Sequence, residues 1–228
     1  MTLDLNGHTL TTSYTVYPKG NAVINNGTLK STGSSDLIYV TSGNNLTMNN
    51  VEFSSRRNGI TVDSGSTLEL NDCTGSAQEA MIYTNGNGNV VVNGGEYTSI
   101  DNGVVMDNGS SGKGGNHIVI NDGHFIGHIT SAGYLAHIIY LANDDTLDIK
   151  DGTFEVENGS AIVVRAGKLN VSTKVKITAT GNVSGKVGDG AQLIPAGHDI
   201  VIDTKSNYPA VASLNVQAPG KDIFKIEA

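Results

Sequence analysis

The chain has 228 residues and a formal net charge of −8, and its few arginines provide no basic stripe with which to bind nucleic acid. Its single cysteine excludes an internal disulfide framework, and no apolar stretch is long enough for insertion into a membrane. Hydrophobic residues make up 38% of the chain and glycines number 29, which suits a thin, elongated repeat better than a large globule.

A short pattern recurs along the chain: an apolar residue, any residue, a second apolar residue and Asn. It begins at Leu3-Asp4-Leu5-Asn6 and returns in the middle of the chain at intervals of about 22 residues. The Asn positions of the following copies are Asn25, Asn49, Asn71, Asn93 and Asn121. The alternation within each copy is typical of a half-buried strand, and a period that contains only strands and turns is typical of a solenoid.

A second short strand is predicted before most of these copies. Its predicted inward-facing pairs are Ile38 with Val40, Ile60 with Val62, Ile82 with Thr84, Val104 with Met106, Ile138 with Tyr140 and Ile162 with Val164.

A third strand is predicted after the Asn position. Four positions beyond the Asn it carries one aromatic column, Phe53, Tyr97, Phe125 and Phe154. Stacking of coils would bury these rings, and the Asn side chains are expected to hydrogen-bond from coil to coil.

These columns and this period resemble the right-handed parallel β-helix of pectin-lyase-like proteins, over roughly residues 1–190. The resemblance implies an all-β, single-stranded solenoid with about 22 residues per coil. Residues 191–228 are expected to form closing strands and a C-terminal cap. Tail-spike, fibre and appendage proteins of phages use this scaffold, and surface proteins of gut bacteria have coils similar to residues 3–10.

Residues 123–137 exceed the period and are interpreted as an insertion, which in a solenoid projects from one face and often binds a ligand. His124, His128 and His137 in this stretch are weak candidates for a metal site. No ligand spacing repeats among them, so ordinary surface histidines are the simpler interpretation and no cofactor is expected.

Glu96, Asp122 and Asp72 are weak candidates for acid–base catalysis beside the Asn column. Carboxylates two coils apart in one column would lie about 9.6 Å from each other. This separation is at the wide end of the range of about 6.5–9.5 Å for an inverting glycosidase. The alternative is that these acidic residues only solvate an exposed face.

The catalytic motifs of polygalacturonases with this architecture are not reproduced. Asp144-Asp145 and Gly127-His128 occur in the reverse order, and the Asn-Thr-Asp and Arg-Ile-Lys motifs are absent. No catalytic residue is therefore carried over from the resemblance.

Tyr39 and Tyr83 are predicted to point outward from the second strand, two coils apart. With Arg56, Arg57 and Tyr134 they are candidates for a shallow glycan-binding groove. A rigid, exposed ladder without a ligand is the alternative.

The preferred function is a non-enzymatic structural or binding β-helix on a virion or cell surface, in contact with glycans or neighbouring subunits. One alternative is a polysaccharide-degrading enzyme, a hydrolase or lyase with a diverged site. The other is an adhesin or carbohydrate-binding module of a larger bacterial surface protein. Because the first predicted coil has an open edge, a homotrimer or docking to a larger assembly is expected.

Overall fold

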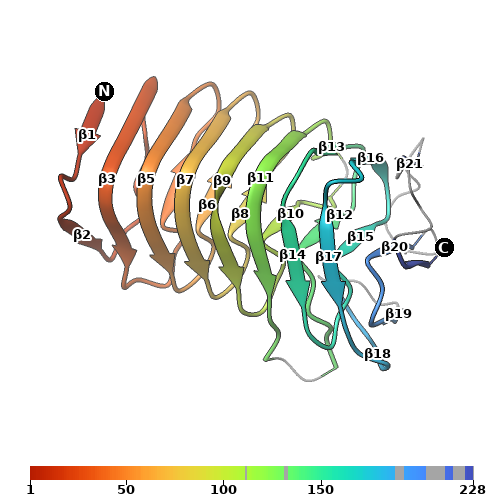
Figure 1. The fold of residues 1–228 in the computed structure, drawn as a ribbon. Coiled ribbons are helices and arrows are strands. Elements are labelled where there is room, and N and C mark those ends of the chain that lie inside the picture. Colours follow the sequence, from red (N-terminus) through yellow and green to blue (C-terminus); the bar gives the residue numbers. More distant parts are fainter. Residues whose placement is uncertain (111, 131–132, 188–192, 204–213, 218–223, 228) are drawn as a thin grey trace.

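The computed structural model describes residues 1–110, 112–130, 133–187, 193–203, 214–217 and 224–227. The chain is an all-β parallel solenoid of roughly 9 turns with about 23 residues each, which confirms the predicted fold class and nearly matches the predicted period. The coils wind in a right-handed sense and stack into a rod with the termini at opposite ends (Figure 1). The described residues contain no helix that is long and apolar enough to span a membrane.

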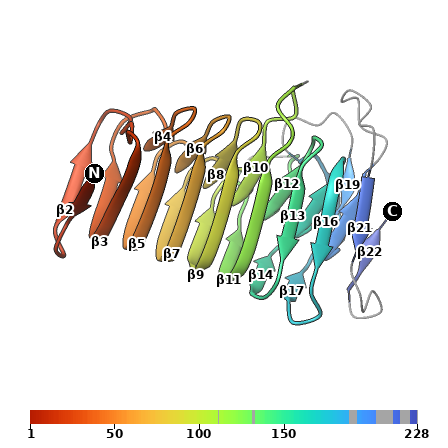
Figure 2. The ribbon, with the colours of Figure 1, turned by 90° about the horizontal axis from the view of Figure 1, so that it is seen from above.

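Two parallel sheets form the sides of the rod and lie as separate layers when seen from above (Figure 2). The long-strand sheet contains β1 (Thr2–Asp4), β2 (Thr9–Thr12), β3 (Asn21–Ser31), β5 (Asn45–Ser55), β7 (Thr67–Ala77), β9 (Asn89–Ser99), β11 (His117–Gly127), β13 (Thr146–Ile149), β14 (Thr153–Val156), β16 (Gly167–Val171), β17 (Lys176–Ala179) and β21 (Leu214–Gln217). The short-strand sheet contains β4 (Ile38–Val40), β6 (Ile60–Val62), β8 (Ile82–Thr84), β10 (Val105–Asp107), β12 (Ile139–Leu141), β15 (Ile162–Val164), β20 (Ile200–Ile202) and β22 (Ile226–Glu227). A separate antiparallel pair is formed by β18 (Ser184–Gly185) and β19 (Ile194–Pro195).

The long strands turn a corner just after the Asn position. Asn26, Asn50 and Asp72 hold this corner with φ angles of 53°, 51° and 49°, a left-handed conformation that Asn and Asp tolerate better than other side chains. The strands predicted on either side of the Asn are therefore one bent strand of 11 residues in β3, β5, β7, β9 and β11. They are separate strands in the first coil, as β1 with β2, and in the later coils, as β13 with β14 and β16 with β17.

The predicted Asn column is confirmed as a continuous hydrogen-bonded ladder. Asn49 Nδ2 donates to Asn25 Oδ1, Asn71 to Asn49 and Asn93 to Asn71, each at 2.8 Å, and Asn121 continues the series to Asn93. Each shared amide thus satisfies a half-buried polar group at the corner of the coil.

The predicted aromatic column is confirmed as part of the core. Phe53, Tyr97, Phe125 and Phe154 are all at most 1% exposed. Ring centroids are 5.5 Å apart for Tyr97 and Phe125 and 4.7 Å apart for Phe125 and Phe154. In the intervening coil Gly75 leaves room for Phe53, because a Cβ there would lie 2.8 Å from its ring.

Two segments lengthen the coils in the middle of the chain, residues 108–116 between β10 and β11 and residues 128–138 between β11 and β12. The second segment starts at His128 rather than at Gly123 as expected, because β11 runs to Gly127. The parallel ladders extend beyond residue 190, since β20 pairs with β15 and β21 pairs with β16.

Candidate functional site

The outer face of the short-strand sheet carries a column of large side chains. The middle residues of β4, β6, β8, β10 and β12 are in register and read Tyr39, Thr61, Tyr83, Met106 and Tyr140. Side chains alternate between the two faces of a strand, so the residues that flank each of these face the core while the column itself faces outward.

Two of the predicted inward-facing pairs, those of β10 and β12, are wrong by one residue. Val105 and Ile139 hold the inward position, so Met106 and Tyr140 face outward. A shift of one residue moves every side chain of a strand to the opposite face. Consecutive apolar residues in both segments conceal the alternation, and for this reason the sequence did not reveal Met106 and Tyr140 as candidate site residues.

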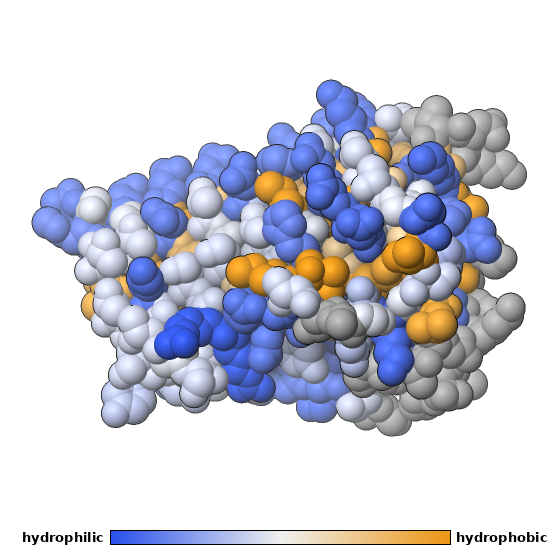
Figure 3. Space-filling model, turned by 90° about the horizontal axis from the view of Figure 1, so that it is seen from below, coloured by the Kyte–Doolittle hydropathy of each residue, from blue (hydrophilic) through white to orange (hydrophobic). Residues whose placement is uncertain are grey.

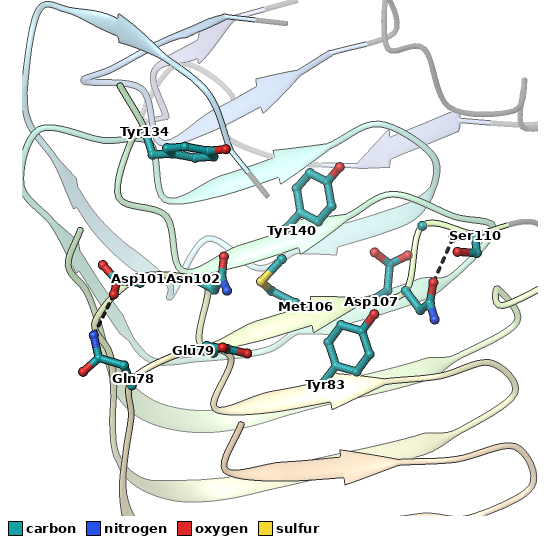
Figure 4. A pocket seen from close by; sticks show the side chains of 12 residues that line it. Gln78, Glu79, Tyr83, Asp101, Asn102, Met106, Asp107, Ser110, Tyr134 and Tyr140 are labelled. Atoms are coloured by element: carbon teal, nitrogen blue, oxygen red, sulfur yellow. Dashed lines mark hydrogen bonds between the residues drawn. The ribbon is translucent and has the colours of Figure 1, made fainter. Parts of the chain in front are cut away.

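Around Tyr83, Met106 and Tyr140 the outer face is hollowed into a cavity of about 750 Å³, here called the tyrosine groove. Tyr134, from the segment between β11 and β12, lies across the groove from the strands (Figure 4). The lining residues come from three successive coils and are Gln78, Glu79, Tyr83, Asp101, Asn102, Met106, Asp107, Asn108, Gly109, Ser110, Tyr134 and Tyr140.

The groove ends where the outer face of the sheet becomes covered. Tyr140 belongs to a second apolar cluster outside the solenoid core. Its partners there include Leu135, Ile194 of β19, and Val187 and Ala196, which lie next to the β18–β19 pair in the sequence. Seen from below, apolar side chains gather over the middle and the C-terminal half of the molecule, whereas the N-terminal third is mainly polar (Figure 3). The tyrosine groove therefore lies where the outer face of the sheet passes from the partly exposed Tyr83 to the buried Tyr140.

One rim of the groove is built from polar side chains that bridge neighbouring coils. Asp101 accepts hydrogen bonds from Gln78 Nε2 at 2.6 Å and from the backbone N–H of Thr130 at 3.0 Å. Glu79 pairs with Arg57, whose Nε lies 3.5 Å from Oε2. Arg57 also lies 3.5 Å from Asp36, so it links two turns along the edge of the sheet.

The opposite rim is an amide ladder. Asn108 Nδ2 donates to Asn85 Oδ1 at 2.9 Å, and Asn85 Nδ2 donates to Asp63 Oδ1 at 3.2 Å. Asn108 Oδ1 also accepts from the backbone N–H of Ser110, which orders the start of the lengthened turn. Amide and carboxylate groups of this kind can bind the hydroxyl groups of a ligand from both sides.

A buried carboxyl pair lies at the inner end of the groove. Burial raises the pKa of Asp107 far above its ordinary value, and a hydrogen bond to Asp145 raises it further. Burial also raises the pKa of Asp145, which accepts from the backbone and side-chain N–H groups of Asn116 at 2.8 and 2.9 Å. Because Asp107 also accepts from Ala142 N–H at 2.8 Å, this pair ties two neighbouring coils together.

Beneath the covered end, charged and ionisable groups surround Tyr140. The guanidinium of Arg165 lies 5.3 Å from the ring centroid of Tyr140 and 3.4 Å from Asp203. The ring of His137 meets the Tyr140 ring edge-on at 6.1 Å. Complete burial lowers the pKa of His137 to about 4. Its imidazole is therefore neutral and packs against the Tyr140 ring without a buried charge.

The candidate catalytic carboxylates lie on the long-strand sheet, away from this groove. Glu96 lies 3.2 Å from Nδ1 of His124, and Nε2 of the same ring lies 3.4 Å from Glu155, so three coils contribute to a row of ionisable side chains at the surface. Asp72 and Asp122 stand at the corners of their strands, and Asp122 accepts from the backbone N–H of Gly123.

The three histidines of the expected metal site are dispersed. His124 lies in β11 between two glutamates, His128 is exposed, and His137 is buried beside Tyr140. Among the residues that the structure describes, no three His, Cys, Asp or Glu side chains are placed to hold a metal ion.

The candidate binding residues are only partly brought together. Tyr83 and Tyr134 both line the tyrosine groove, and Tyr39 lies two strands away in the same outward column. Arg57 contacts the rim through Glu79, whereas Arg56 is directed to the carbonyl of Thr32. Gln78 and Asn102 were missed because they lie in turns, where the strand pattern gives no signal.

Comparison of the chain with protein-family models, with curated proteins and with solved structures finds no match. The fold and the geometry of the groove are thus the basis for a functional proposal.

Proposed function

We propose that this chain is a non-enzymatic glycan-binding β-solenoid of a virion or cell surface, with the tyrosine groove as its binding site. The observation that carries the proposal is the composition of the groove: tyrosine rings and Met106 form an apolar floor, and amides and carboxylates line both rims. Sugar rings present apolar faces and a belt of hydroxyl groups, and concave sites that combine aromatic surface with a few polar groups suit such ligands.

The state of the carboxyl groups supports a binding role over catalysis. Asp101 is engaged by Gln78 and Thr130, and Glu79 is paired with Arg57. Asp107 is only 2% exposed and its carboxyl is committed to Ala142 and Asp145. A glycosidase needs one free acid and one free base on opposite sides of the bond that is cleaved.

The test is a glycan array followed by calorimetry with the ligands it identifies. Replacement of Tyr83 by Ala is expected to weaken binding about tenfold or more, since truncation of an aromatic hot spot costs about 2 kcal/mol or more and a tenfold loss corresponds to about 1.4 kcal/mol. Tyr14→Ala is the matched control, because Tyr14 is 81% exposed in the first coils, away from the groove. Absence of any glycan ligand, or equal affinity of Tyr83→Ala and the unmodified chain, would refute the proposal.

The enzymatic alternative is tested on the same polysaccharides by assays for new reducing ends and for unsaturated uronates. No turnover is expected. Turnover that Glu96→Gln or Asp122→Asn abolishes would instead place an active site on the long-strand sheet and contradict the non-enzymatic part of the proposal.

The surface location and the assembly into a homotrimer or a larger body stay predictions. β1 and β2 each pair with β3 alone among the described strands, so their outer edges are where a partner strand would add. Light scattering at micromolar concentration checks assembly, and a thermostable monomer would count against it.

A further inference from the structure

We infer that the ligand of the tyrosine groove is an extended, uncharged, β-linked sugar chain that runs along the solenoid axis from Tyr134 to Tyr39. This inference rests on the proposed function and adds the class of ligand and its direction. The cavity around Tyr83 is the deep end of the path, and the outward column continues from it past the nearly buried Thr61 to the partly exposed Tyr39.

The spacing of the tyrosines indicates the direction. Tyr39 and Tyr83 stand in the same column with one strand, β6, between them, which places their backbones about 9.6 Å apart. Both side chains are partly exposed, and a further ring, Tyr17, lies 6.1 Å from Tyr39. In an extended β-1,4-linked chain every second sugar presents the same face, so stacking platforms are needed at disaccharide spacing.

The polar rims run parallel to the same column. The amide ladder from Asn108 through Asn85 to Asp63 follows three coils, and Asn85 also donates to the hydroxyl of Tyr39 at 3.5 Å. On the other side, Arg57 joins Asp36 to Glu79. Hydrogen-bonding groups therefore recur at each coil, as successive sugars along the axis require.

The charge of the rims indicates an uncharged ligand. The described residues that line the groove include Glu79 and Asp101 but no Lys or Arg. Arg57 at the rim already faces two carboxylates. The guanidinium of Arg165, 5.3 Å from the Tyr140 ring, is buried and faces Asp203. Uronic and sialic acids would meet like charges at close range, whereas neutral hexoses would not.

The covered end limits the path. Tyr140 is 1% exposed and is itself part of the second apolar cluster, so a chain cannot stack beyond it. A longer sugar chain can extend only towards Tyr39, so additional sugars raise the affinity only when they lie at that end.

The experiment is calorimetry with length series of neutral oligosaccharides: cellobiose, cellotetraose and cellohexaose, with the matching manno- and N-acetylated chito-oligosaccharides, and oligogalacturonates as the charged comparison. In at least one neutral series affinity is expected to rise with length, and the oligogalacturonates are expected to bind more weakly. Tyr39→Ala should weaken the hexasaccharide of that series about tenfold and leave the disaccharide unchanged, whereas Tyr83→Ala should weaken both. Tyr14→Ala serves again as the control, with thermal unfolding to verify that each variant is folded.

Failure of the axial sugar chain and failure of glycan binding give different results. If short sugars bind through Tyr83 but affinity does not rise with length, or Tyr39→Ala has no effect on the hexasaccharide, the axial chain is wrong and the glycan-binding groove stands. Tighter binding of oligogalacturonates than of every neutral series would overturn the uncharged ligand. If no sugar binds, the proposed function fails together with this inference.

Discussion

The coils from β3 to β11 and the coils from β12 onward share one core but present different surfaces. In the first region each long strand is an unbroken run of 11 residues, and Tyr39 and Tyr83 are partly exposed on the outer face of the short-strand sheet. In the second region the long strands split into pairs, and the β18–β19 pair and Leu135 cover that face. The comparison shows that the regular coils build the rod, whereas departures from the repeat build the groove.

The departures do not disturb the core, because they are confined to turns. β10 and β12 remain in register across residues 108–138, with Val105 opposite Ile139. Longer loops in a solenoid cost only the entropy of closing them, which grows slowly with length. Segments that wall the groove can therefore be added between coils while the ladders on both sides are kept.

The largest expected effect tests the junction between the two regions. Phe125 lies in the last unbroken long strand and stacks on Tyr97 on one side and Phe154 on the other. Phe125→Ala should lower the free energy of unfolding by about 3–5 kcal/mol, because it leaves a cavity in a fully buried column. Urea unfolding measures this loss, with the exposed Tyr14→Ala as control. A loss below about 1 kcal/mol would mean that the two regions do not share one core.

A smaller effect is expected from the covered region and depends on pH. The pKa of His137 is about 4 in the folded chain, below its ordinary value of 6.5, so the unfolded chain binds a proton first as pH falls. Stability should therefore decrease by about 3 kcal/mol between pH 6.5 and 4 on account of this group. His137→Gln should remove that loss.

The measurement is the difference in unfolding free energy between pH 7 and pH 4.5, compared with His128→Gln, which alters an exposed histidine. Each variant is compared with wild type because Asp107 also makes the unfolding free energy depend on pH, with the opposite sign to His137. The raised pKa of Asp107 keeps a proton in the folded chain that the unfolded chain releases, so its contribution falls as pH rises. Equal acid sensitivity of wild type and His137→Gln would contradict the burial of His137.

The smallest expected effect concerns the regular region. Asn71 both donates to Asn49 and accepts from Asn93, so Asn71→Ala removes two hydrogen bonds of the ladder. A loss of about 1–2 kcal/mol is expected, since each bond contributes about 0.5–1.5 kcal/mol. Thermal unfolding measures this loss of stability, with Thr74→Ala, a change at an exposed position of the same strand, as the control. An unchanged transition temperature for Asn71→Ala would show that the hydrogen bonds of the ladder contribute no stability.

Much of the fold could be predicted from single residues in the repeat. The Asn ladder and the column from Phe53 to Phe154 followed from spacing alone, because coils that stack in register bring equivalent positions together. The outward direction of Tyr39 and Tyr83 followed from the alternation in their strands. The register of β10 and β12 could not be predicted in this way. Val104-Val105-Met106 and Ile138-Ile139-Tyr140 are runs of consecutive apolar residues, so either alternation of inward and outward side chains fits the sequence equally well.

By itself the sequence determined the parallel solenoid, its period and its core columns, because these depend on interactions that repeat from one coil to the next. Only the tertiary structure decided where the groove lies. Its closed end depends on contacts of Tyr140 with Leu135, Val187 and Ile194, which stand in segments of the chain that follow no repeat. Such contacts form between particular surfaces in three dimensions, so no periodicity in the sequence records them.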